Sequence, residues 1–184
     1  MTRLQLWNKN TVSIDLIYKL NFLNLHEINC LKNIVLKSTV NSSISEPKDI
    51  IFGLVVLELL TNQKAKVLRT RKSIAAFKTR KFIPISSKVT IRSKNLYDFL
   101  DFLICIALPK LSQFKELNKN NLVTSQNSLS LGLANLTMFP QLSKESERLP
   151  KNMGLTITFN SDTVGKTTPK LLLFLGEFQM PVIL

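Results

Sequence analysis

The sequence predicts an α+β fold built on an antiparallel sheet. Three stretches alternate apolar and polar residues with the period of a half-buried strand, at 32–40, 85–92 and 153–160. Stretches with helical spacing are mixed among them. A length of 184 residues and a hydrophobic content of 45% are sufficient for a sizeable core, so residues 1–184 are expected to form a single domain.

The N-terminal part predicts a helix followed by a strand. Apolar side chains recur at helical spacing from Val12 to Leu23, within a segment that covers residues 1–30. The first strand comes next, with Ile34 and Leu36 on its buried face.

Three further helices are predicted. A proline at position 47 suits the first turn of a helix over 50–60. This stretch is almost entirely apolar, so the helix is expected to be buried on most sides. An amphipathic helix over 96–108 is expected to end at Pro109, and a short last helix covers 170–175.

A basic tract without acidic residues carries the strongest functional signal. Between Leu59 and Tyr97 there are eleven basic side chains and no acidic one, in a chain with a net charge of +13. Such a tract is most easily tolerated beside a polyanion, and nucleic acid is the usual one, although an anionic membrane surface also attracts it. No apolar run approaches the roughly 20 residues that cross a bilayer.

The tract divides into an arm and a strand. Residues 69–81 have no periodic apolar face and are expected to form a long loop or arm. In the strand that follows, Lys88, Thr90 and Arg92 share one face, whereas Ile91 lies on the other. A strand face with two cations and a hydroxyl is suited to a row of phosphate contacts.

The tip of the arm, Ser73 to Phe77, is a small apolar cluster. It is slim enough to approach an RNA backbone or groove closely. The alternative is a loop that folds back so that Phe77 packs on the domain.

Catalytic and metal-binding chemistry is not indicated, so we expect no enzyme, cofactor or metal ion. His26 is the only histidine, and the few acidic residues are scattered. Gly165-Lys166-Thr167 ends like a phosphate-binding loop, but Asn160 stands where its first glycine is needed. Cys30 and Cys105 are expected to be buried, reduced thiols rather than metal or redox sites.

The order of residues in and around the tract is distinctive. It includes Gln63-Lys64, Thr70-Arg71-Lys72-Ser73-Ile74-Ala75-Ala76-Phe77-Lys78, Arg80, Pro84-Ile85 and Lys88-Val89-Thr90-Ile91-Arg92, then Ile106-Ala107-Leu108-Pro109-Lys110, Phe114, Leu131-Gly132, Met138-Phe139-Pro140 and Gly154-Leu155-Thr156-Ile157-Thr158. These motifs resemble those of the bacterial-type large-subunit ribosomal protein L-five family, with colinear matches over about residues 20 to 180.

This resemblance implies an antiparallel sheet with helices on one face, the other face holding 5S rRNA in the central protuberance. The RNA-binding residues that it implies are Lys37, Gln63, Lys64, Lys88, Thr90 and Arg92. It also implies an arm that reaches toward P-site tRNA, through Arg69, Arg71, Lys72, Ser73, Ala75, Ala76, Phe77, Lys78, Arg80 and Lys81. Further implied partners are a small-subunit head protein, met through an intersubunit bridge, and other large-subunit proteins.

The sequence departs from the family pattern at three places. Lys37-Ser38-Thr39-Val40-Asn41 replaces an Asn-Met-Gly-Val-Gly turn, Ala76 replaces a glycine, and Gln141 replaces an acidic residue. Loss of glycines changes how closely RNA can approach the backbone.

The Lys- and Asn-rich composition favours the mitochondrion, with the plastid and the bacterial cytoplasm as alternatives. In a ribosome without 5S rRNA, large-subunit rRNA would be the partner. A basic peripheral membrane or scaffold protein that binds anionic lipid is the competing class. An RNA-processing enzyme would need an acidic or histidine cluster, which the sequence lacks.

Overall fold

The computed structural model describes residues 2–21, 27–28, 30–44, 46–110, 122–125, 128–143, 145, 148–150, 153–161 and 168–180. The helices are α1 (Arg3–Trp7), α2 (Ser13–Leu20), α3 (Ile50–Thr61), α4 (Lys94–Phe102), α5 (Pro140–Ser143) and α6 (Thr168–Glu177). The strands are β1 (Leu31–Val40), β2 (Lys66–Arg69), β3 (Pro84–Ile91), β4 (Leu122–Ser125), β5 (Ser128–Leu133) and β6 (Met153–Ser161). Shorter π-helical or 3-10 turns cover Asn8–Val12, Asn41–Ile44, Pro47–Asp49, Ala75–Phe77, Leu103–Ala107 and Leu108–Lys110.

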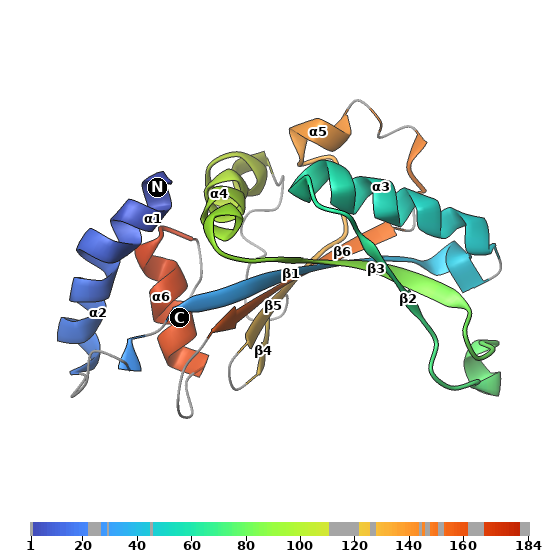
Figure 1. Cartoon of the computed structure of the whole chain (residues 1–184), viewed down its shortest axis with the longest axis horizontal. Helices are drawn as coiled ribbons and strands as arrows, with labels where there is room; N and C mark the ends of the chain where they lie inside the picture. The colour runs from blue at the N-terminus through green and yellow to red at the C-terminus, as the bar shows by residue number, and fades with distance from the viewer. Residues whose placement is uncertain are drawn as a thin grey trace. The chain divides into compact units, whose positions relative to one another are not determined.

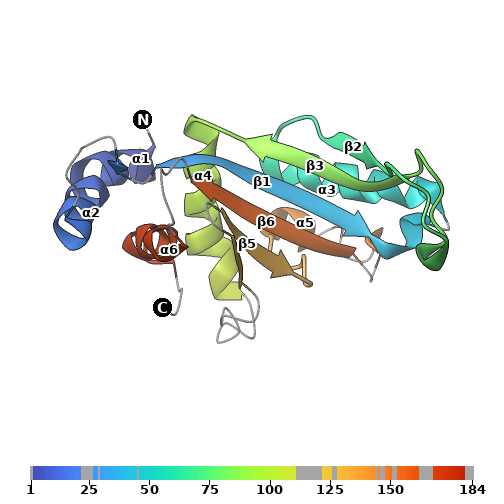
Figure 2. The same cartoon turned by 90° about the horizontal axis from the view of Figure 1, so that it is seen from below.

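The strands, labelled in Figure 1, form a six-stranded sheet. Their order in the sheet is β2-β3-β1-β6-β5-β4, so β2 lies at one edge. Neighbouring strands run antiparallel, as the arrows of β3, β1, β6 and β5 show in Figure 2. The predicted α+β class is therefore confirmed. The three stretches with strand periodicity correspond to β1, β3 and β6.

The chain divides into two compact units, and the division runs through the strands. Unit 1 comprises Met1–Ile34, Ile91–Leu131 and Thr158–Leu184. Unit 2 comprises Val35–Thr90 and Gly132–Ile157, so it contains α3, β2 and the arm.

In unit 2, α3 is buried on one side only. Its buried residues are Ile50, Gly53, Val56, Leu57 and Leu60. On its outer side, Ile51, Phe52, Val55 and Leu59 are between 37% and 57% exposed. The prediction of a helix buried on most sides is therefore wrong. The sheet covers one side of α3. Within the described part of unit 2, the only other α-helix that contacts α3 is α5, which is a single turn.

Gly53 brings α3 close to the strands. A Cβ at this position would lie 2.8 Å from the Ser87 hydroxyl and 3.6 Å from that of Ser38. Both serines are buried, and among the described residues the Ser87 Oγ has no hydrogen-bond partner. Ser38 of β1 and Ser87 of β3 thus point toward the helix.

Replacing Gly53 by Ala is expected to lower the stability of the protein by about 1–2 kcal/mol. Overpacking costs about 1–3 kcal/mol, which exceeds the gain of up to about 1 kcal/mol in helix propensity. Urea unfolding followed by circular dichroism measures the change.

Ser87→Ala is the matched control for this prediction. It removes the hydroxyl that the new methyl group would meet, so Gly53→Ala combined with Ser87→Ala should recover the loss. Equal stability of Gly53→Ala and the original chain would contradict the close approach.

In unit 1, the N-terminal helices pack against α4. The Arg3 guanidinium lies 2.5 Å from the Asp101 carboxylate, and the Asn8 amide donates a hydrogen bond of 3.0 Å to the Tyr97 hydroxyl. Burial raises the pKa of the Tyr97 phenol. The apolar faces of these helices are buried around Leu16, which is fully covered.

The predicted amphipathic helix continues past its expected end. After α4, the chain forms a π-helical turn and then a 3-10 turn over Leu108–Lys110, which contains Pro109. A proline is tolerated there because the first residues of a helical turn need no N–H donor.

The two cysteines are exposed, so the prediction of buried thiols is wrong. Cys105 lies on the π-helical turn, with its Sγ 3.3 Å from the Arg3 guanidinium and 3.2 Å from the Asp101 carboxylate. Cys30 directly precedes β1. Apolar neighbours in the sequence do not ensure burial: Leu31 beside Cys30 is buried, but Ile106 beside Cys105 is 41% exposed.

Several sequence features lie outside the described residues, namely Leu23, His26, Phe114 and Gly165-Lys166-Thr167. Within the described ranges, no helix has the length and apolar character of a membrane span.

Candidate nucleic-acid interface

The strands of unit 2 have one face toward α3 and one face away from it. Because Ser38 and Ser87 point toward α3, the neighbouring Lys37 and Lys88 point to the opposite, open face. Thr90 shares the face of Lys88, two residues along β3. Burial agrees with this assignment: Val89 is 4% exposed, whereas Lys88 and Thr90 are partly exposed.

The arm connects β2 to β3, and the register of these two strands places Lys66 directly opposite Lys88. Residues that face each other in an antiparallel pair lie on the same side of the sheet, with their Cβ atoms about 4.5–5.5 Å apart. Two cations in this arrangement repel each other. Neither lysine forms an ion pair with a described residue. The pair therefore concentrates positive charge on this face, an arrangement suited to an anion such as phosphate.

Sequence reasoning did not select Lys66 as a site residue. It lies in the basic tract, but only the pairing of β2 with β3 puts it beside Lys88. The long arm between the two strands conceals that pairing. The alternation of β3 alone identifies one half of the pair.

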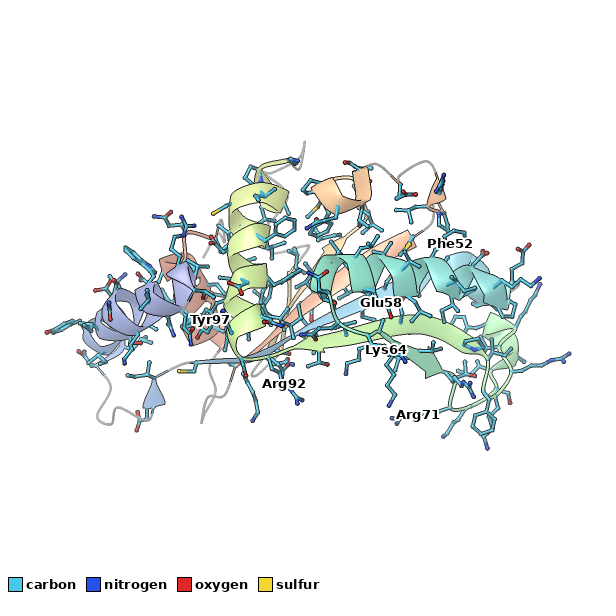
Figure 3. All side chains as sticks on the ribbon, turned by 45° about the horizontal axis from the view of Figure 1, so that its top comes forward. Phe52, Glu58, Lys64, Arg71, Arg92 and Tyr97 are labelled. Atoms are coloured by element: carbon cyan, nitrogen blue, oxygen red, sulfur yellow. The ribbon has the colours of Figure 1, made fainter. Side chains whose placement is uncertain are left out.

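Gln63 and Lys64 lie in the connection from α3 to β2. Asn62 ends the helix in the left-handed conformation with φ of 51°. The Gln63 N–H then donates to the Thr61 hydroxyl at 3.3 Å, and Lys64 is exposed. In Figure 3, Lys64 lies close to the β2–β3 ribbon.

The arm is an ordered hairpin rather than an irregular loop. It projects beyond β2 and β3 (Figure 1) and contains a β-bridge between Ile74 and Thr79. Both backbone hydrogen bonds of this bridge are present, at 3.1 and 3.2 Å. The tip is the 3-10 turn Ala75–Phe77.

The side chains of the arm are available to a partner. All ten predicted arm residues are exposed: Arg69, Arg71, Lys72, Ser73, Ala75, Ala76, Phe77, Lys78, Arg80 and Lys81. Phe77 is 67% exposed, so it does not pack back on the domain. Figure 3 shows Arg71 on the side of the β2–β3 ribbon opposite to Phe52 of α3.

Arg92 belongs to unit 1 and is exposed immediately after β3. The strand residues of unit 1 present polar groups of their own. The Asn160 amide donates to the Asn33 amide oxygen at 2.7 Å, and the hydroxyls of Ser130 and Thr158 lie 3.0 Å apart.

The six strands contain no acidic residue. A polyanion on the open face of unit 2 would therefore meet cations, hydroxyls and amides without a repelling carboxylate on the strands. No group of three or more potential metal ligands occurs in the described part of the chain. The arrangement is suited to binding phosphate and sugar groups rather than to acid–base or metal chemistry.

Comparison with known proteins identifies the family. A family model that describes the C-terminus of the ribosomal protein L-five family matches residues 84–182. The large ribosomal subunit protein uL5m of Reclinomonas americana is 34% identical over 182 residues, which cover 99% of this chain and 98% of that protein.

Bacterial relatives are similar over almost the same length. The large ribosomal subunit protein uL5 of Mesoplasma florum is 31% identical over 98% of this chain and 97% of its own length. That of Karelsulcia muelleri is 34% identical over 91% of this chain and 88% of its own length.

The matched segment begins at β3, the strand that carries Lys88 and Thr90, and the full-length similarity also covers β1, α3 and the arm. A basic membrane-surface protein, the competing class, does not account for these matches. The chain therefore belongs to the ribosomal protein L-five family and is a structural protein of the large ribosomal subunit, not an enzyme.

Proposed function

We propose that the open face of unit 2 binds rRNA in the central protuberance of the large subunit, either 5S rRNA or neighbouring large-subunit rRNA. The observation that carries this proposal is the Lys66–Lys88 pair on a strand face without acids. Phosphate oxygens between the two ammonium groups would turn a repulsive pair into two charge-assisted contacts. Lys37, Gln63, Lys64 and Thr90 extend the contact on unit 2, and Arg92 binds RNA in this proposal as a residue of unit 1.

The arm contacts P-site tRNA in this proposal. Its cations and Phe77 are exposed, and the hairpin is held by backbone hydrogen bonds before any partner binds. Small side chains at Ser73, Ala75 and Ala76 let the tip approach an RNA backbone closely. A photo-cross-linker at Ala76 should yield tRNA adducts in translating ribosomes.

A further surface of the chain meets a small-subunit head protein at an intersubunit bridge, and other surfaces meet large-subunit proteins. The ribosome in question is the mitochondrial one, which the mitochondrial relative supports, with plastid and bacterial ribosomes as alternatives. Immunoprecipitation of the chain from fractionated cells checks the compartment and the small RNA bound. A chain that does not sediment with large subunits would overturn the proposal.

Lys66→Gln is expected to weaken rRNA binding and to leave the free protein equally stable or slightly more stable. It removes a phosphate contact, so the slope of log affinity against log salt should fall by about one. It also removes the repulsion with Lys88, which costs up to about 1 kcal/mol. Filter binding with transcribed 5S rRNA and thermal melting of the free chain measure the two effects.

Lys48→Gln is the matched control, because it removes the same charge from the exposed turn before α3. It should change the salt slope far less than Lys66→Gln. Equal effects of the two variants would show that net charge, rather than the strand face, attracts the RNA.

A further inference from the structure

Phe82, at the base of the arm, has an unusual backbone conformation. Its φ is 69°, in the left-handed region that a bulky side chain rarely adopts. Its side chain is nevertheless 64% exposed, so apolar burial does not compensate for the conformation. Strain of this kind persists only where the surrounding structure enforces it, and it is concentrated at ligand sites.

Thr70 enforces the conformation from the opposite strand of the arm. Its carbonyl oxygen accepts from the Phe82 N–H at 3.1 Å, and its N–H donates to the Ile83 carbonyl at 2.9 Å. Its hydroxyl accepts from the Ile83 N–H at 3.0 Å and donates to the Arg80 carbonyl at 2.5 Å. The backbone of Phe82 is thus held in a hydrogen-bonded turn, from which the exposed ring projects.

The ring lines a shallow groove beside the edge strand. The other residues of this groove are Lys66, Val67, Leu68, Arg69, Thr70 and Arg71. Three of them are cations and none is acidic. The Lys81 ammonium lies 4.9 Å from the centre of the Phe82 ring, so a fourth cation is close to the aromatic face.

We infer that this groove binds an unpaired RNA base stacked on Phe82, with the adjacent phosphates held by Arg69 and Arg71. An exposed aromatic ring surrounded by cations combines the two features that bind single-stranded nucleic acid: stacking for the base and positive charge for the backbone. A peptide with an apolar side chain would use the ring but not the cations. The inference rests on the proposed RNA-binding function. It adds that one nucleotide of the bound RNA occupies the groove at Phe82.

The test compares two ligands of the full chain, a single-stranded heptaadenylate and an abasic strand with the same phosphates. The chain should bind heptaadenylate about tenfold more tightly at equal salt, because only that ligand can stack. Phe82→Gly and Phe82→Leu should abolish this preference, whereas Phe82→Tyr should keep it. Equal affinity of the original chain for the two strands would overturn the inference.

Two controls separate stacking from other effects. Tyr18→Ala removes an exposed ring of α2, outside the groove, and should leave the base preference intact; loss of the preference in this variant would place stacking at Tyr18 instead. Phe82→Gly should melt no lower than the original chain, since glycine adopts positive φ without strain. Retained rRNA binding without a base preference contradicts only the stacking site, whereas absence of rRNA binding contradicts the proposed function itself.

Discussion

Raising the salt concentration from 50 to 200 mM should weaken binding of the full chain to rRNA about a thousandfold. If the strand face and the arm neutralise about six phosphates, the same number of counterions is released on binding, and the affinity falls steeply with salt. Filter binding or fluorescence anisotropy over that range, with transcribed 5S rRNA and a fragment of large-subunit rRNA, measures the slope.

In the double variant Lys88→Ala with Arg92→Ala, the slope of log affinity against log salt should be shallower by about two. The variant should remain folded. A flat salt dependence of the original chain would contradict phosphate neutralisation as the main source of affinity. Binding to anionic vesicles but not to either RNA would favour the lipid-binding alternative.

Ile91→Ala should destabilise the protein by about 2–5 kcal/mol. Ile91 is 1% exposed at the end of β3, and truncation of a buried side chain costs both the lost apolar burial and the cavity that remains. Chemical unfolding, monitored by circular dichroism, measures the loss.

The neighbouring residue supplies the control. Arg92 is exposed, so Arg92→Ala should change stability by less than about 0.5 kcal/mol while it weakens RNA binding. Similar losses of stability in both variants would contradict the assignment of these residues to opposite faces.

The faces of the long strands were predictable because apolar and polar residues alternate along them in the sequence. Alternation separates Lys88 and Thr90 from Ile91, and the structure has the same division. The arm was predictable from its charge and lack of periodicity. Its internal β-bridge and its tip were not, since the bridge joins only two residues, Ile74 and Thr79, within a tract that has no alternating pattern.

The outer side of α3 shows a different limit. A helix that is apolar all round carries no periodic signal, so its sequence does not indicate which side meets the sheet. Gly53, next to Ser87, marks the inner side, but only after the two elements are placed together. Likewise, the left-handed conformation of Phe82 depends on hydrogen bonding to Thr70, which the sequence around Phe82 does not indicate.

The position of β2 at the edge of the sheet gives its cations a second consequence. An edge strand presents unpaired backbone groups that can pair with another chain and lead to aggregation. This strand has four residues, a bulge after Leu68, and a cation at each end, Lys66 and Arg69. Short length, irregular register and positive charge all discourage a second strand from adding there. The side chains proposed to hold RNA would therefore also oppose strand addition at this edge in the free protein.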